Sequence, residues 1–174
     1  MRLVQAVALS SIPLALAFTP GARVLGSRST ARAEGGSGDF TRTVALTPSG
    51  AAKAMAAAEA EAAANGWKVT IVVADASGTP MMLHRNAFPA SCDIAMGKAK
   101  SAVLFGKATA GLEAAANVAN GTGRSALLSS PFVLMRGGVP IVVDGQVIGS
   151  IGVSGVAAQD DEKVALAGAA SLMS

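Results

Sequence analysis

The sequence has few of the residues on which many protein functions depend. Only 3% of its 174 residues are aromatic, tyrosine is absent, and it has one cysteine and one histidine. The single cysteine, Cys92, excludes an intramolecular disulfide framework and a cysteine-rich metal site. The single histidine, His84, means that any Ser-His or Cys-His mechanism has to use that imidazole. Because rings are scarce, we expect a core of Ala, Val, Ile and Leu.

Charge is scarce as well, at 14% of residues, whereas 51% are hydrophobic. This composition excludes a mainly disordered chain. The first 33 residues contain four arginines and no acid, and the rest of the chain has 10 basic and 11 acidic residues. A near-neutral body with few aromatic rings lacks the basic surface and the stacking groups of nucleic-acid-binding proteins. We therefore expect no nucleic-acid partner.

The N-terminal 38 residues have the pattern of a targeting sequence. Residues 1–17 are signal-peptide-like, with an uncharged run that ends in Ala15-Leu16-Ala17. This run is shorter than the about 20 apolar residues of a membrane span. Residues 18–38 combine a basic, Ser/Thr-bearing, transit-like stretch with a Gly-rich linker. The arrangement resembles the bipartite presequences of algae with secondary plastids. We expect a plastid protein, or alternatively a secreted one, without membrane association after processing, and a domain at 39–174.

Four helices are predicted in this domain. The first is the clearest, because Thr47 is a typical cap, Pro48 suits the first helical position, and ten of the fourteen residues 51–64 are alanine. Asn65-Gly66 ends it. The others are predicted over 94–105 with Ser91 or Asp93 as cap, over 109–118 with Thr109 as cap and Asn120-Gly121 as stop, and over 164–173 after the acids at 160–162.

Two hairpins are predicted as well. The β-branched run 67–75 and the short run 81–85 enclose turn residues. Residues 139–143 and 146–153 enclose Asp144-Gly145, which is typical of a two-residue type I′ turn. Hairpins interleaved with helices indicate an α+β fold with a mainly antiparallel sheet flanked by helices.

The glycines of the second hairpin do not form a nucleotide-binding motif. Gly149, Gly152 and Gly155 lack the spacing of a dinucleotide fingerprint, and no Lys-Ser/Thr pair follows them as in a P-loop. We interpret them as positions where another backbone or helix approaches the strand closely.

His84 has two interpretations. A lone histidine on a short strand is commonly solvated or hydrogen-bonded. The alternative is an axial ligand to haem iron, with Arg85 next to it holding a propionate through charge-assisted hydrogen bonds. The thioethers of Met81, Met82, Met96 and Met135 are further possible iron ligands, although methionine commonly fills a core.

Several stretches together resemble the HbpS/GlcG-like haem-binding, haem-degrading domain family, over about residues 46–173. They are Leu46-Thr47 with the Ala-rich helix, Gly66-Trp67 leading into residues 69–78, Lys98-Ala99-Lys100, Gly137-Gly138-Val139-Pro140-Ile141, and residues 144–155 beginning with Asp144-Gly145. The Gly-Gly-x-Pro-Ile stretch followed by the Asp-Gly hairpin is the most specific of these.

The resemblance implies a profilin-like α+β fold, a homo-oligomer, and haem or a related tetrapyrrole as ligand. Thr109 lies in a segment similar to one in which a haem-binding member of the family has a haem-contacting Thr; the alternative is a simple helix cap. The family often has an acid where this chain has His84. Two hypotheses follow: a protein that binds haem or a tetrapyrrole, with slow haem degradation, or a non-catalytic oligomeric protein that binds another small molecule or acts as an accessory module of the glycolate-operon-associated type.

Overall fold

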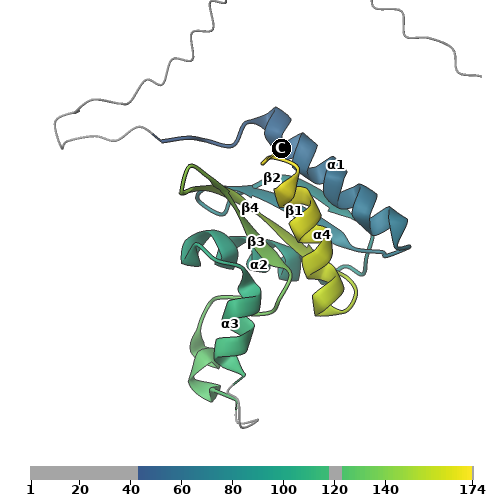
Figure 1. Ribbon diagram of the computed structural model, residues 1–174. Coiled ribbons are helices and arrows are strands. Elements are labelled where there is room, and N and C mark those ends of the chain that lie inside the picture. The colour runs from purple at the N-terminus through teal and green to yellow at the C-terminus, as the bar shows by residue number, and fades with distance from the viewer. Residues whose placement is uncertain (1–42, 118–122, 174) are drawn as a thin grey trace, which may run out of the picture. The chain divides into compact units, whose positions relative to one another are not determined.

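The computed structural model describes residues 43–117 and 123–173 (Figure 1). The predicted presequence, with its cleavage sites, and the predicted helix stop at Asn120-Gly121 lie outside these residues. The elements, in chain order, are α1 (Pro48–Ala64), β1 (Thr70–Asp75), β2 (Pro80–Arg85), α2 (Ser91–Phe105), α3 (Thr109–Ala116), the 3-10 helix η1 (Ser125–Ser129), β3 (Gly138–Val143), β4 (Gln146–Ser154) and α4 (Ala158–Ala170).

The four strands form one antiparallel sheet in the order β2-β1-β4-β3. Both predicted hairpins are confirmed. At the second turn Asp144 and Gly145 have φ angles of 50° and 77°, as a type I′ turn requires. Pro140 lies on the edge strand β3, where a residue without an amide hydrogen is tolerated.

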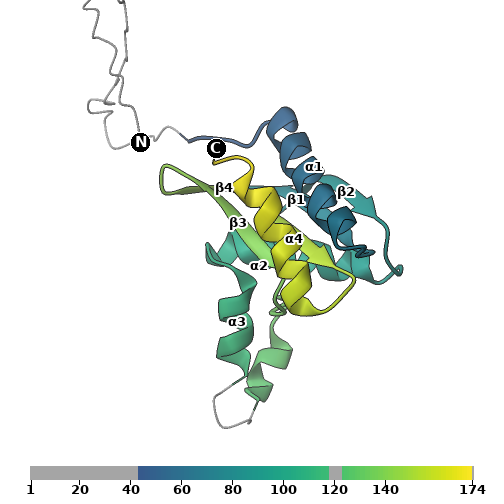
Figure 2. The same cartoon turned by 45° about the vertical axis from the view of Figure 1, so that its right-hand side comes forward.

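Helices cover both faces of the sheet, so the predicted α+β class is confirmed (Figures 1 and 2). Alternate residues of β1 point to opposite faces. Ile71 and Val73 pack in the large core beneath α1 and α4, whereas Val72 and Ala74 pack against α2. The core consists of small and branched aliphatic side chains, as the scarcity of aromatic residues predicts.

The alanine-rich composition of α1 lets this helix lie close to its neighbours. The Thr47 hydroxyl caps it by accepting a hydrogen bond from the Gly50 amide at 3.1 Å. In α4, a Cβ atom added to Gly168 would lie 2.8 Å from the Ala54 carbonyl oxygen, so the two helices nearly touch through their backbones. Among the described residues, no helix has the length and apolar composition needed to cross a membrane.

The helix starts differ from the predicted caps in two places. Helix α2 begins at Ser91, and neither Ser91 nor Asp93 caps it. The Ser91 hydroxyl is buried and hydrogen-bonded to the Thr70 hydroxyl at 2.6 Å, which joins α2 to β1. Helix α3 begins at Thr109 with Ala108 as its cap residue, so Thr109 is not a cap either. In both cases a tertiary partner has taken the hydroxyl that would have bonded a local amide.

The glycines of β4 allow close backbone contact, as predicted. A Cβ atom on Gly152 would lie 2.0 Å from the Ala95 carbonyl oxygen and 2.6 Å from the Ala99 amide nitrogen. Helix α2 therefore rests directly on the backbone of β4.

We expect Gly152→Ala to lower the free energy of unfolding by about 3 kcal/mol or more, because the added methyl group has to displace α2. The matched control is Gly111→Ala in α3, where nothing lies within 4 Å of the added atom and the change should stabilise the helix by about 1 kcal/mol. Urea unfolding followed by circular dichroism measures both. Equal stability of Gly152→Ala and the parent would contradict the packing described here.

Candidate functional site

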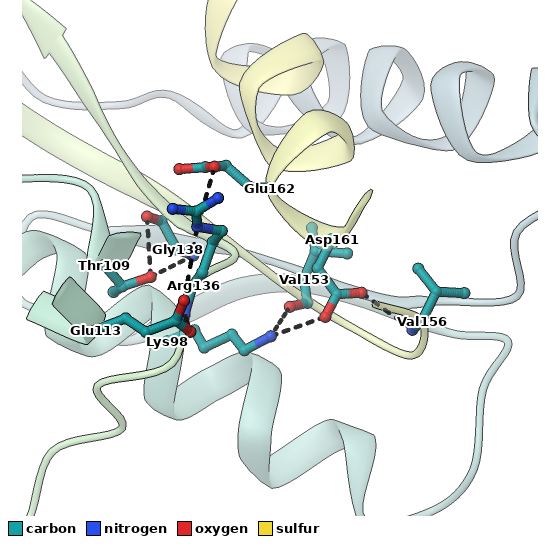
Figure 3. A network of polar contacts seen from close by, with 9 residues as sticks. All are labelled: Lys98, Thr109, Glu113, Arg136, Gly138, Val153, Val156, Asp161 and Glu162. Atoms are coloured by element: carbon teal, nitrogen blue, oxygen red, sulfur yellow. Dashed lines mark hydrogen bonds and ion pairs between the residues drawn. The ribbon is translucent and has the colours of Figure 1, made fainter. Parts of the chain in front are cut away.

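A fully buried ion pair joins the two helical layers at one end of the sheet (Figure 3). The Lys98 side chain of α2 is 1% exposed and the Asp161 side chain of α4 is 3% exposed. Lys98 Nζ donates to Asp161 Oδ2 and to the Val153 carbonyl oxygen, both at 2.8 Å. The second oxygen of Asp161 accepts a hydrogen bond from the Val156 amide at 3.2 Å. All these partners offset part of the cost of burying two charges.

Burial raises the pKa of the Asp161 carboxyl above its usual value, and the hydrogen bond and positive charge of Lys98 oppose that rise. Removing Lys98 would leave the Asp161 carboxyl buried without its cation.

Two glycines make room for this pair. Gly137 has a φ of 115°, a conformation that other residues rarely adopt, and a Cβ atom there would lie 2.9 Å from Lys98 Nζ. A Cβ atom on Gly138 would lie 2.4 Å from the Lys98 carbonyl oxygen. Gly137 therefore leaves room for the Lys98 amino group, and Gly138, the first residue of β3, leaves room for the α2 backbone at Lys98.

Thr109 is fully buried beside the same glycines. Its hydroxyl accepts a hydrogen bond from the Gly138 amide at 2.8 Å and lies 3.4 Å from the Gly138 carbonyl oxygen, to which it donates. The contact fastens the start of α3 to β3. Because both partners are backbone atoms of Gly138, the role of the Thr109 hydroxyl in these contacts is to position α3.

Arg136 continues the attachment of α3. Its backbone amide donates to Glu113 Oε2 at 2.9 Å, and its Nε lies 3.8 Å from Glu113 Oε1 and 3.5 Å from Glu162 Oε2. The guanidinium therefore lies between a carboxylate of α3 and one of α4 (Figure 3).

His84 lies at the opposite edge of the sheet, on β2. Its side chain is 57% exposed, and Nδ1 lies 2.5 Å from Oε1 of Glu59 on α1. Glu59 and His84 line one side of a small hollow of about 220 Å³, whose other walls include Trp67, Val69 and Ile71. The carboxylate holds the imidazole in a fixed orientation and leaves Nε2 without a partner in this contact.

The structure does not bring the three predicted site residues together. His84 pairs with Ile71 and Arg85 with Thr70, so the two neighbours point to opposite faces of the sheet. Arg85 Nη1 donates to the Ala87 carbonyl oxygen at 2.8 Å. Thr109 contacts β3, which is three strand spacings, or about 14 Å, from β2.

A larger apolar groove, of about 590 Å³, lies between the end of α3, η1 and residues 130–135. Met135, one of the four methionines considered as iron ligands, lines it together with Arg124 and Phe132. The described part of the chain contains no cluster of three or more His, Cys, Asp or Glu side chains arranged to hold a metal ion.

The fold and these contacts define a profilin-like α+β domain with two candidate binding surfaces. The sequence model of the family described as "Haem degrading protein HbpS-like" matches residues 46–170. The chain belongs to this HbpS-like family.

Three known proteins show how similar this chain is to other members and to solved structures. Protein GlcG of Escherichia coli K12 is 40% identical over 114 residues, which cover 64% of this chain and 82% of GlcG. The crystal structure of a double mutant of Streptomyces reticuli HbpS has a TM-score of 0.67 and 30% identity, covering 82% of this chain and 97% of that one. A structure described as a PduOC:heme complex has a TM-score of 0.65 and 28% identity, covering 74% and 95%.

Sequence reasoning missed the Lys98–Asp161 pair. The signal was present, because Lys98 falls three residues after Ala95 and four before Ala102, on the stripe of α2 that packs against the sheet. A lysine on an apolar stripe needs a buried partner. That partner, Asp161, is one of the acids predicted at the start of the last helix.

We expect Lys98→Met to lower the free energy of unfolding by about 3–5 kcal/mol, because the Asp161 carboxylate stays buried without its cation. Asp161→Asn should have a similar cost. The double variant should lose less than the sum of the two, since both charges are then removed.

The control for this series is Lys163→Met. Lys163 forms an exposed pair with Asp160 on the same helix, and its loss should change the free energy of unfolding by about 1 kcal/mol or less. Urea midpoints for the four variants provide the measurement. If Lys98→Met and Lys163→Met unfold at the same urea concentration, the buried pair does not stabilise the domain.

Proposed function

We propose that this domain binds haem or a related tetrapyrrole, and that His84 is the ligand to its iron. The observation that carries the proposal is the contact between His84 Nδ1 and the Glu59 carboxylate. A histidine that binds a metal through one ring nitrogen commonly donates its other N–H to a carboxylate, which fixes the ring and increases its basicity. The Nδ1–Glu59 contact is of this kind and would leave Nε2 as the nitrogen for the iron.

The surroundings of His84 suit a flat apolar ligand. The hollow beside it is lined by Trp67, Val69, Ile71 and two alanines of α1. Met82 lies two residues before His84 on the same face of β2 and is 36% exposed. A hollow of about 220 Å³ is smaller than the roughly 300–1,000 Å³ of pockets that enclose a ligand. We therefore propose that the tetrapyrrole lies across this surface and does not enter a closed pocket.

Two comparisons support this ligand. The family description is of haem-degrading proteins, and the PduOC domain, 28% identical to this chain, has a structure described as a haem complex. The Glu59–His84 contact provides an orienting group of the kind that such iron ligands use.

We further propose that the bound haem is slowly broken down. When bound, haem iron would supply redox chemistry, and the protein would contribute the imidazole of His84. Because the His84 side chain is more than half exposed, a group held there would be accessible to water and small oxidants. The sign of such activity is decay of the Soret band after addition of peroxide or reductant.

A non-catalytic oligomeric accessory role, of the type that the likeness to GlcG suggests, is the alternative. Edge strand β2 and the loop after it expose Met82, Leu83 and Phe88, which are 36%, 44% and 51% exposed. Exposed apolar side chains on a sheet edge favour association.

We expect light scattering of the purified domain at micromolar concentration to give a mass above that of the monomer, because association covers these side chains. Leu83→Lys should reduce this mass, since it places a charge on the edge strand. A monomer for the parent would contradict self-association.

Haemin titration tests the ligand proposal. We expect His84→Ala to weaken haemin binding by more than about tenfold and to move the Soret band, because the imidazole is lost. Glu59→Gln should weaken binding by about tenfold or more and keep the histidine-type spectrum, since it removes only the orienting charge.

The matched control is Glu61→Gln on the same helix, whose carboxylate contacts Asn65 and should not affect haemin. Thr109→Ala should lower stability, because it releases α3 from Gly138, and should leave the Soret position unchanged. An unchanged titration for His84→Ala, together with lost binding in Thr109→Ala, would overturn the assignment of His84.

A further inference from the structure

The groove at the end of α3 is a second concave surface, separate from the hollow beside His84. Its described walls come from the end of α3, η1 and the segment that leads to β3. In Figures 1 and 2, α3 runs away from the sheet, so this groove lies beyond the β3 edge. His84 is on β2, at the other edge.

The walls of the groove are mostly apolar and partly open to water. Leu127, Leu128, Phe132, Val133, Leu134 and Met135 line it. Leu128 is 89% exposed and Met135 is 49% exposed. Apolar side chains in a concave site of about 590 Å³ are typical of small-molecule pockets, whose volumes are roughly 300–1,000 Å³.

The groove has one charged lining residue among those described, Arg124. No ion pair or hydrogen bond joins the Arg124 side chain to another described residue. The remaining polar lining groups are the Ser125 and Ser130 hydroxyls and the Asn117 amide. A single unpaired guanidinium beside neutral donors is complementary to one carboxylate.

Two of the three walls, the end of α3 and residues 132–133, are attached to the rest of the domain. On one side, Thr109 and Glu113 fasten α3 to β3 and Arg136. On the other side, Phe132 packs edge-on against Phe105 of α2, with ring centroids 5.0 Å apart. Next to it, Val133 lies over Gly97, where an added Cβ atom would be 2.3 Å from the valine Cγ2. Attachment of these two walls lowers the entropy cost of ordering the groove on binding.

We propose that this groove binds an amphipathic carboxylate, with the apolar body along η1 and residues 132–135 and the carboxylate on Arg124. The ligand class follows from the Arg124 cation, which pairs with no described residue, from the absence of an acid among the described lining residues and from the apolar walls. The site is independent of His84 and adds a second ligand to the function proposed above.

Dodecanoate is the probe, titrated calorimetrically into the same protein that is used for haemin. We expect saturable binding of one dodecanoate per chain, and Arg124→Gln should weaken it by about tenfold or more. Dodecanol has the same apolar chain without the charge, so its binding should not change in Arg124→Gln. Leu127→Asn should weaken both probes, and Lys53→Gln on α1 is the control that should weaken neither.

Three results would overturn the proposal. The first is equal affinity of the parent and Arg124→Gln for dodecanoate. The second is absence of binding by the parent. The third is a dimer that Leu128→Asn converts to a monomer in a protein that does not bind dodecanoate, because the groove would then hold a second copy of the chain.

Haemin distinguishes this proposal from the one for His84. Arg124→Gln should bind haemin as the parent does. Haemin is itself an amphipathic carboxylate, so its loss in Arg124→Gln with normal binding in His84→Ala would support the groove and contradict the assignment of His84. Loss in His84→Ala alone would support both sites as proposed.

Discussion

The buried pair between Lys98 and Asp161 is the contact on which the rest of the arrangement depends. It joins α2 on one face of the sheet to α4 on the other. Two buried charges are tolerated only when each has its partners, and here the carbonyl of Val153 and the amide of Val156 complete the set. Gly137 leaves room for the lysine amino group and Gly138 for the α2 backbone at Lys98, which explains the Gly-Gly pair at the start of β3.

The same corner holds α3 in place. Thr109 bonds the backbone of Gly138, and Arg136, just before the glycines, lies between carboxylates of α3 and α4. The position of α3 in turn defines one wall of the apolar groove. Far from this corner, α1 supplies Glu59 to orient His84. The contacts around Lys98, Thr109 and Arg136 thus position α3 beside the apolar groove. At the other edge of the sheet, Glu59 orients the imidazole of His84.

Local patterns were enough to predict most of the fold. The alanine content of α1, the β-branched run of β1 and the Asp-Gly turn each act within a few residues, and all three are confirmed. The hydroxyls of Ser91 and Thr109 could not be assigned in this way, because partners 21 and 29 residues away compete with the local amides. Likewise, the sequence identified His84 as the only imidazole, but its partner Glu59 is 25 residues away and depends on how α1 packs on β2.

The central claim is that the imidazole of His84, oriented by Glu59, binds the metal of a tetrapyrrole. The chain has one histidine, so a sample labelled with ¹⁵N-histidine reports on this imidazole alone by nuclear magnetic resonance. Titration with diamagnetic gallium protoporphyrin should shift the Nε2 resonance strongly while Nδ1 keeps its proton. If the porphyrin absorbance changes and both imidazole resonances stay where they were, the ligand binds elsewhere and the claim is wrong.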